Sequence, residues 1–156
     1  MRETLFNWLG QNLAGLTCLD LFAGSGALGF EAASRNATLV VMVERDRAAF
    51  LALEHNAREL GGTHLHLVRA DALKWIGAPQ RAAEPKYDVV FLDPPYRGAL
   101  LQGVFPHLNA LLNPGARIYA ESAKPFCPDG YSAIRSGRAG QVHYQLLQPS
   151  EPATES

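Results

Sequence analysis

The sequence DLFAGSGALG occupies residues 20–29, where an apolar run, Leu16–Phe22, gives way to a stretch with helical spacing, Ala27–Asn36. Glycines at positions 24 and 26 permit positive φ angles and let a ligand approach the backbone where a Cβ atom would collide. Gly24, Gly26 and Gly29 also satisfy the G-x-G-x-x-G spacing of dinucleotide sites. The segment therefore predicts a strand, a glycine-rich turn and a helix that together bind a nucleotide-like ligand.

Strand-length apolar runs and helical stretches alternate along most of the chain. The runs are continuous in Val, Leu and Ile, which is typical of parallel strands covered by helices on both faces. This order predicts a doubly wound parallel sheet. The further expected elements are a helix over residues 2–13, strand Leu39–Glu44, helix Arg47–Leu60, strand Leu65–Arg69, a helical turn at Ala72–Trp75, strand Tyr87–Leu92, a helix over Ala99–Leu112 that Pro106 can break, and strand Arg117–Glu121.

The last part of the chain has a different pattern. Tyr131–Ser136 and Val142–Gln148 are strand-like, and the short loop between them, with Gly137 and Gly140, has no room for a crossover helix. They should therefore pair antiparallel. A mostly parallel sheet that ends in an antiparallel hairpin fits the class I methyltransferase variant of the three-layer, Rossmann-like α/β fold better than the dehydrogenase variant. We expect one domain over residues 1–148 and a disordered tail over residues 149–156.

The composition argues against a membrane protein, a secreted protein and a metal site. The 156 residues are 47% hydrophobic and 19% charged, as in a soluble globular domain. Because no apolar run reaches the roughly 20 residues of a membrane helix and no secretory signal is present, we expect a cytoplasmic protein with no membrane partner. Cys18 and Cys127 form no CxxC pair and the histidines are scattered, so we expect no metal.

The formal net charge of −1 gives no global basic signature. If nucleic acid is the substrate, a local patch, a missing segment or a partner must supply the affinity. Arg97, Arg135 and Arg138 are candidates for phosphate contacts, although each is equally well explained as a solvated surface residue.

Acidic residues at the ends of the predicted strands indicate which ligand is bound. A carboxylate at Asp20 suits a cation and opposes a pyrophosphate. S-adenosylmethionine carries an ammonium and a sulfonium but no phosphate. The alternative role for Asp20 is to cap a helix or brace the loop. Glu44 is placed to accept hydrogen bonds from both ribose hydroxyls, which NAD shares. Asp71 is placed to accept from the adenine amino group, or else to cap the following helix. The expected cofactor residues are Asp20, Phe22, Gly24, Gly26, Glu44, Arg45, Asp71 and Ala72.

The sequence DPPY, Asp93 to Tyr96, follows the fourth predicted strand. Pro94 restricts Asp93 to an extended conformation, and Pro95 lacks an N–H, so the turn is stiff and the Pro94 carbonyl is free to accept a hydrogen bond. Two convergent acceptors match the two hydrogens of an exocyclic amine, and Tyr96 offers a face for an unstacked base. We therefore expect Asp93, Pro94, Pro95 and Tyr96 to form a catalytic turn that methylates an amino nitrogen of a base.

Four stretches resemble one family, the RsmD-type 16S rRNA (guanine-N(2))-methyltransferases. They are RETLFNWL at residues 2–9, DLFAGSGALGFEA at 20–32, DPPY at 93–96 and AGQVHY at 139–144. The resemblance implies methylation of a guanine amino group in ribosomal RNA, on the small ribosomal subunit or its assembly intermediate. Members of this family usually begin with a further basic, glycine-rich segment. Because the RETLFNWL stretch here follows Met1 directly, we expect this chain to lack that segment.

Two alternatives remain open at this point. An adenine-amino methyltransferase acting on DNA or RNA would also use the DPPY turn, because adenine carries an exocyclic amine. An NAD-binding oxidoreductase or a non-catalytic nucleotide-binding module would explain the glycine spacing and Glu44 but would leave Asp20 and the DPPY turn unexplained.

Overall fold

The computed structural model describes residues 2–61, 64–79, 86–95 and 100–150. Its strands are β1 (Thr17–Asp20), β2 (Leu39–Glu44), β3 (Leu65–Arg69), β4 (Tyr87–Leu92), β5 (Leu112–Ser122), β6 (Tyr131–Ala139) and β7 (Val142–Pro149). Its helices are α1 (Arg2–Leu9), α2 (Ala27–Ser34), α3 (Arg47–Leu60), α4 (Ala72–Ile76) and α5 (Leu101–Leu108), and a 3-10 turn, η3 (Asn109–Leu111), follows α5.

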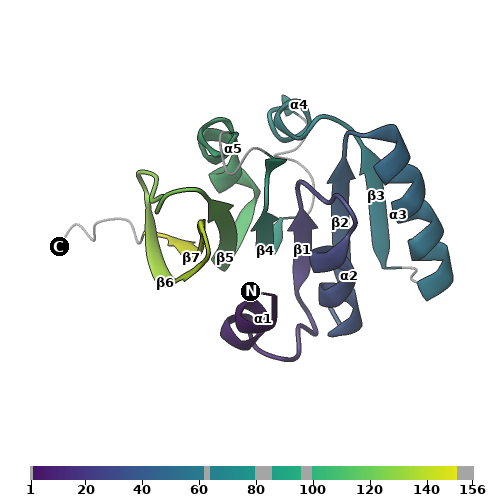
Figure 1. Ribbon diagram of the computed structural model, residues 1–156, viewed down its shortest axis with the longest axis horizontal. Helices are drawn as coiled ribbons and strands as arrows, with labels where there is room; N and C mark the ends of the chain where they lie inside the picture. The colour runs from purple at the N-terminus through teal and green to yellow at the C-terminus, as the bar shows by residue number, and fades with distance from the viewer. Residues whose placement is uncertain (1, 62–63, 80–85, 96–99, 151–156) are drawn as a thin grey trace.

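The strands of the described residues form one seven-stranded sheet in the order β3-β2-β1-β4-β5-β7-β6 (Figure 1). Strands β1 to β5 pair in parallel, whereas β7 pairs antiparallel with both β5 and β6. The chain moves outward from β1 to β3 and then returns to place β4 on the other side of β1. The predicted fold, a doubly wound parallel sheet with an antiparallel hairpin at its end, is confirmed.

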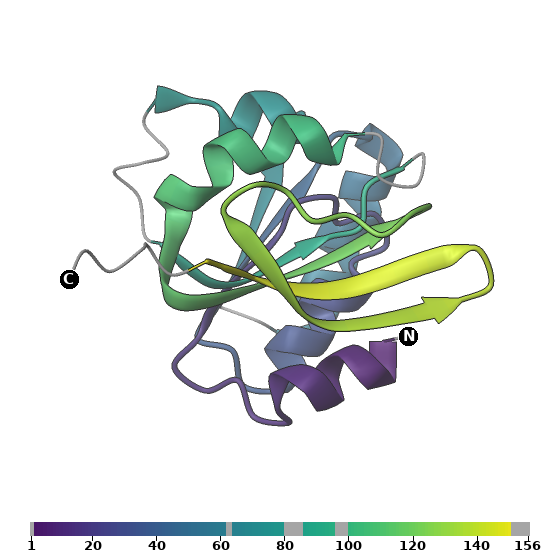
Figure 2. The same cartoon turned by 90° about the vertical axis from the view of Figure 1, so that its left-hand side faces the viewer.

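Helices cover both faces of this sheet, so the molecule has three layers (Figures 1 and 2). On one face, buried residues of α1, α2 and α3, such as Phe6, Ala32 and Leu53, pack against the sheet. On the other face, α4 and α5 contribute residues such as Trp75 and Val104 to a second core. The strands between the two cores are buried on both sides, which explains their continuous apolar runs.

Several boundaries differ from the sequence prediction. Helix α1 ends at Leu9 rather than near residue 13, because Gly10 adopts a φ of 99° and its N–H donates to the Phe6 carbonyl at 3.0 Å. Strand β5 begins at Leu112 rather than Arg117, since Leu112 already pairs with Tyr87 of β4. Pro106 lies inside α5, which continues to Leu108.

The tail predicted from residue 149 also begins too early. Pro149 is the last residue of β7 and pairs with Tyr131, and the N–H of Ser150 donates to the Gly130 carbonyl at 2.7 Å. These contacts to β6 and the turn before it hold both residues on the sheet. The rest of the predicted tail, residues 151–156, lies outside the described residues.

The topology determines where a ligand can bind. Because β1 to β4 are parallel, the residues at their carboxyl ends meet along one edge of the sheet. The chain reverses its direction of progress between β1 and β4, and open α/β sheets bind ligands at such a position. No helix of the described residues is long and apolar enough to cross a membrane.

Candidate active site

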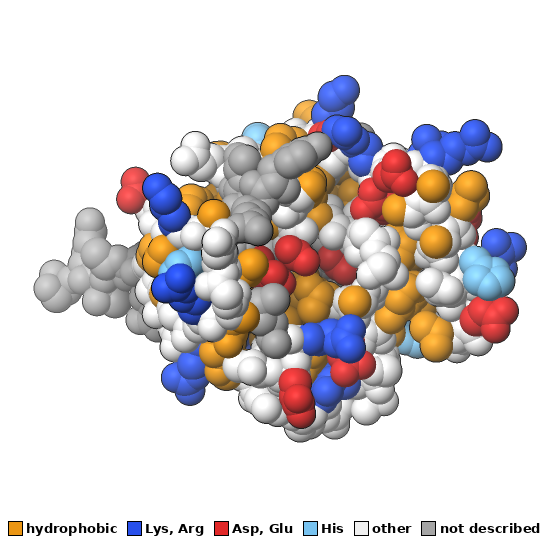
Figure 3. Space-filling model, viewed as in Figure 1, with side chains coloured by type: hydrophobic (Ala, Val, Ile, Leu, Met, Phe, Trp, Pro, Cys, Tyr) orange, Lys and Arg blue, Asp and Glu red, His pale blue; other side chains and the backbone are white. Residues whose placement is uncertain are grey.

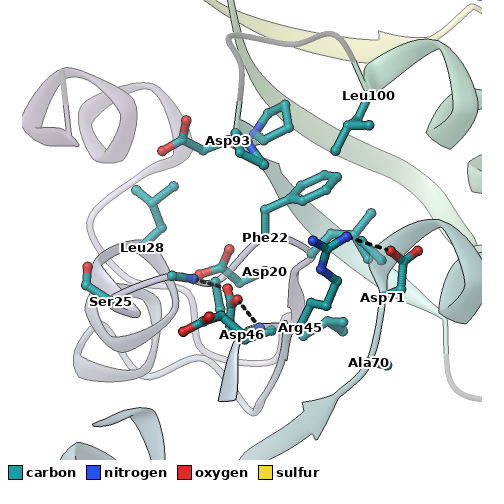
Figure 4. A pocket seen from close by; sticks show the side chains of 18 of the residues that line it. Asp20, Phe22, Ser25, Leu28, Arg45, Asp46, Ala70, Asp71, Asp93 and Leu100 are labelled. Carbon is teal, nitrogen blue, oxygen red and sulfur yellow. Dashed lines mark hydrogen bonds and ion pairs between the residues drawn. The ribbon is translucent and has the colours of Figure 1, made fainter. Parts of the chain in front are cut away.

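A pocket of about 700 Å³ lies at the carboxyl edge of the parallel strands. The loops that follow β1, β2, β3 and β4 all contribute to its wall (Figure 4). The described residues that line it are Asp20, Leu21, Phe22, Ala23, Gly24, Ser25, Ala27, Leu28, Val43, Glu44, Arg45, Asp46, Ala70, Asp71, Ala72, Leu73, Asp93, Pro94, Pro95 and Leu100. The pocket thus brings together the glycine-rich turn and the DPPY turn, which are about 70 residues apart in the sequence.

Glu44, at the end of β2, connects two loops of the pocket. Its Oε1 accepts a hydrogen bond of 2.8 Å from the N–H of Gly24, and its Oε2 accepts one of 2.8 Å from the N–H of Asp46. The carboxylate therefore fixes both the glycine-rich turn and the loop that follows β2. Each oxygen keeps a second lone pair, so Glu44 can still accept hydrogen bonds from a ribose.

The two glycines at the start of the turn have different surroundings. Gly24 lines the pocket with a φ of 55°, and a Cβ atom at this position would meet nothing within 4 Å. Gly26 has a φ of 85° and is not among the lining residues; a Cβ there would lie 2.4 Å from Phe30 Cε2 and 2.6 Å from Leu53 Cδ2. Gly26 therefore lets α2 and α3 pack closely beneath the turn.

Asp20, the last residue of β1, is the most buried acid of the pocket. Its side chain is 2% exposed, and its Oδ2 accepts a hydrogen bond of 3.1 Å from the N–H of Gly29 in α2. Burial raises the pKa of Asp20 to about 7, and repulsion from Asp93 and Glu44 adds to the effect, while the Gly29 bond opposes it. Asp20 thus accepts from an N–H in the first turn of α2, as the alternative, helix-capping interpretation predicted, and its charged form is costly until a cation lies nearby.

Asp71 caps α4, because its Oδ1 accepts a hydrogen bond of 3.1 Å from the N–H of Lys74. The predicted helix-capping role is therefore confirmed. Its Oδ2 lies 3.5 Å from Nη1 of Arg45, which comes from the loop after β2. The Lys74 N–H and the Arg45 guanidinium hold the pKa of Asp71 below its usual value. Ala72, the next residue, is buried in the pocket wall.

The charges around the pocket are mostly negative. Among the described lining residues Arg45 is the only cation, and it is paired with Asp71. The acids that line the pocket are Asp20, Glu44, Asp46, Asp71 and Asp93. In the space-filling view, acidic side chains gather around a hollow near the middle of one face (Figure 3). This donor set fits a cationic ligand with hydroxyls and an amine, and it opposes a pyrophosphate.

The described part of the DPPY turn, Asp93 to Pro95, forms the rim of the pocket on the β4 side. Asp93 directly follows β4 and is exposed at the pocket mouth, whereas Pro94 is buried. Partial desolvation raises the pKa of the Asp93 carboxyl above its usual value. Pro95 also lines the pocket. Tyr96 and Arg97 lie outside the described residues.

The structure adds pocket residues that the sequence did not indicate. Asp46 is one of them, and its position two residues after Glu44 could have identified it. Leu28 and Leu100 reach the pocket from α2 and from the segment before α5, so only the three-dimensional packing shows their role. The two remaining candidate arginines, Arg135 and Arg138, are exposed on β6.

No group of three or more His, Cys, Asp or Glu side chains in the described part of the chain is arranged to hold a metal ion. Cys18 is buried and its thiol pKa is raised to about 12, chiefly by desolvation. It is therefore an unreactive core residue.

Comparisons with known proteins were made for sequence and for structure. A family model described as "Conserved hypothetical protein 95" matches residues 1–148. Ribosomal RNA small subunit methyltransferase D of Escherichia coli (strain K12) is 40% identical over 157 residues, which cover 95% of this chain and 76% of that protein. The protein of the same name from Haemophilus influenzae is 37% identical, with coverage of 95% and 79%. The solved structure of the Escherichia coli protein yhhF has a TM-score of 0.86 and 38% identity, and the match covers 95% of this chain and 84% of that one.

Proposed function

The chain belongs to the family described as "Conserved hypothetical protein 95", the RsmD-type rRNA methyltransferases, and we propose that it methylates the exocyclic amino group of a guanine in small-subunit (16S) ribosomal RNA. It is an enzyme that uses S-adenosylmethionine. One observation carries the proposed reaction: an acidic pocket at the carboxyl edge of the sheet has the Asp93-Pro94-Pro95 turn as its rim.

The residues of the pocket suit this cofactor. When bound, S-adenosylmethionine supplies a methyl group on a positively charged sulfur. Asp20 and its acidic neighbours favour the positive charge, and Glu44 retains lone pairs for ribose hydroxyls. Asp71 keeps a carboxylate at the far side of the pocket, where it is the candidate acceptor for the adenine amine. Phe22, Gly24, Arg45 and Ala72 complete the proposed cofactor wall, with Gly26 in a supporting position.

At the rim, Asp93 and the Pro94 carbonyl are the proposed acceptors for the two hydrogens of the target amine. Holding both hydrogens orients the nitrogen lone pair toward the cofactor, and the carboxylate stabilises the positive charge that develops on the nitrogen. Proline at both following positions limits the motion of these acceptors. We assign Tyr96, which lies outside the described residues, the role of stacking on the base.

The substrate is ribosomal RNA. We further propose that it is presented within the small subunit or its assembly intermediate, in the cytoplasm, and that the reaction needs no metal. In Figure 3 most basic side chains lie toward the edges of the face, with one basic group just below the acidic hollow. With a net charge of −1, the protein has little general attraction for naked RNA, and ribosomal proteins can provide part of the docking surface.

The alternatives are weaker. Among the described residues that line the pocket, five carboxylates against one arginine oppose the pyrophosphate of NAD, so an oxidoreductase is disfavoured. An adenine-amino methyltransferase would have the same pocket and turn, and the choice between bases depends on the residues that surround the amine.

The proposal is tested with small ribosomal subunits from cells that lack this methylation. Isothermal titration first compares S-adenosylmethionine, S-adenosylhomocysteine and NADH, and we expect only the first two to bind. Transfer of a labelled methyl group is then followed by nucleoside analysis, which should yield N2-methylguanosine from the 16S rRNA. Label in methyladenosine alone would replace the proposal with the adenine alternative.

A further inference from the structure

Glu121 lies next to the proposed catalytic aspartate, on the neighbouring strand. In the parallel pairing of β4 with β5, Leu92 is aligned with Ala120. Asp93 is the first residue after β4 and Glu121 is the next residue of β5, and neighbouring strands are about 4.8 Å apart. Burial raises the pKa of the Glu121 carboxyl, and the charge of Asp93 raises it further, as expected for two carboxylates in close proximity.

The Glu121 side chain is held in place through one of its two carboxylate oxygens. Its Oε2 accepts a hydrogen bond of 2.8 Å from the hydroxyl of Tyr119, which is 1% exposed and therefore rigidly placed. Within the described part of the chain, Oε1 has no hydrogen-bond partner. The carboxylate thus keeps one acceptor oxygen available for a ligand.

An aromatic pair borders Glu121 on the side away from Asp93. Tyr144 of β7 is aligned with Glu121 in the antiparallel pairing, and Trp8 of α1 stacks on Tyr144 with ring centroids 5.5 Å apart. Gly137 leaves room for Tyr144, because a Cβ atom there would lie 2.4 Å from Tyr144 Cζ. Glu121 is therefore flanked by this packed wall and by the site where the target amine is expected.

The bases that carry an exocyclic amine differ in the ring atom beside it. In guanine the amine lies next to N1–H, a hydrogen-bond donor. In adenine and cytosine the corresponding ring nitrogen has a lone pair, which a carboxylate repels. Enzymes that act on a flipped base read such differences at its Watson–Crick edge.

We propose that Glu121 selects guanine by accepting a hydrogen bond from the N1–H beside the amine that Asp93 holds. This role rests on the proposed function and adds a specificity-determining residue to it. It requires only that the base bind with its amine at Asp93 and its N1 toward β5. The same carboxylate disfavours adenine, which separates the two candidate substrates on physical grounds.

The test uses 2-aminopurine, which keeps the 2-amino group but has a lone pair at N1 instead of N1–H. The modified guanine is first located by mass spectrometry of small subunits methylated by the wild-type chain. Small subunits are then reconstituted with 16S rRNA that carries either guanine or 2-aminopurine at that position. Glu121→Gln has the same shape, and its amide can donate to the N1 lone pair as well as accept from N1–H.

We expect the wild-type chain to prefer guanine over 2-aminopurine by at least about tenfold in kcat/KM, the usual effect of a hydrogen bond to a charged group. In Glu121→Gln this preference should fall at least about tenfold, while S-adenosylmethionine affinity stays unchanged. Glu59→Gln, on the exposed surface of α3, is the matched control and should keep the wild-type ratio.

An unchanged ratio in Glu121→Gln would overturn the role of Glu121, and so would loss of transfer to both bases with normal cofactor binding. Either result leaves the proposed function intact as long as the wild-type chain methylates guanine. If the wild-type chain methylates neither base nor any other nucleotide, the proposed function itself fails.

Discussion

Glu44 Oε1 accepts a hydrogen bond of 2.8 Å from the backbone N–H of Gly24, twenty residues earlier in the chain. The end of β2 thereby fixes the turn that follows β1. The same carboxylate holds the N–H of Asp46 through its other oxygen. A single side chain thus shapes two of the four loops that form the pocket.

Replacing Glu44 with glutamine should weaken cofactor binding, although the two side chains have the same size. A glutamine amide has one acceptor oxygen and one NH₂ group, so it cannot accept from both Gly24 and Asp46. Loss of one charged hydrogen bond is worth about 1.5–3 kcal/mol, which predicts a roughly tenfold or greater loss of S-adenosylmethionine affinity by isothermal titration. Glu54→Gln on α3 serves as the control, and equal affinities in the two variants would contradict the bracing role.

Asp20 should make cofactor binding depend on pH. Its pKa of about 7 means that the free protein carries a mixture of neutral and charged Asp20 near neutrality. A sulfonium favours the charged form, so S-adenosylmethionine affinity should rise between pH 6 and 8. S-adenosylhomocysteine has the same amino group but no sulfonium, and its affinity should rise less. In Asp20→Asn, the affinities for S-adenosylmethionine and S-adenosylhomocysteine should depend on pH in the same way, as measured by titration at several pH values.

Asp20 should also make folding stability depend on pH. Stability should fall as the pH rises, whereas cofactor affinity rises. The pKa of Asp20 in the folded state is above its ordinary value of 3.8, so the folded protein holds a proton that the unfolded chain releases. The contribution of Asp20 to the free energy of unfolding is therefore greatest at low pH and falls as the pH rises from about 4 to about 7. Urea unfolding of the ligand-free protein should show a smaller decline in Asp20→Asn, and identical pH profiles would refute the shifted pKa.

Substituting Asp93 with alanine should nearly abolish methyl transfer and leave cofactor binding nearly intact. Asp93 is exposed at the pocket mouth, and its proposed partner is the target amine rather than the cofactor. Loss of one preorganised acceptor typically lowers kcat about 10²- to 10³-fold. Single-turnover transfer to undermethylated small subunits measures the effect, with titration of S-adenosylmethionine alongside. Near-normal turnover would remove Asp93 from the catalytic group.

Gly26→Ala should destabilise the protein more than Gly15→Ala. Both glycines have a similar positive φ, 85° and 84°, so the backbone strain of an added Cβ is comparable. Only at Gly26 does the Cβ collide with Phe30 and Leu53, whereas at Gly15 nothing lies within 4 Å. Overpacking costs about 1–3 kcal/mol, or roughly 2–10 °C in Tm for a chain of this size. Thermal unfolding of the two variants gives the comparison, and equal Tm values would contradict it.

Much of the fold follows from local sequence pattern. Continuous apolar runs separated by helical stretches are enough to predict parallel strands buried on both faces, and a short loop between residues 136 and 142 leaves only an antiparallel pairing. Gly24 permits a positive φ and the prolines after Asp93 restrict the backbone, and both effects act within a few residues, so the two turns could also be located. Such features need no information from distant parts of the chain.

Other features depend on contacts that local pattern does not encode. Gly10 ends α1 through its own backbone conformation, although the apolar spacing continues to Leu13, which is buried without being helical. Gly26 looks like a ligand-binding glycine in the motif, yet its surroundings are Phe30 and the side chain of Leu53 on another helix.

The sequence by itself therefore determined the order of strands and helices, the two motifs and the kind of ligand that an acidic edge favours. Tertiary structure alone decided that Asp20 is buried enough for a pKa of about 7 and that Glu121 lies close enough to Asp93 for the charge of Asp93 to raise its pKa. The physical reason is that burial and strand register depend on how elements far apart in the chain pack together. A shift of one residue between β4 and β5 would turn Glu121 to the opposite face from Asp93, and no local pattern in either strand specifies that alignment.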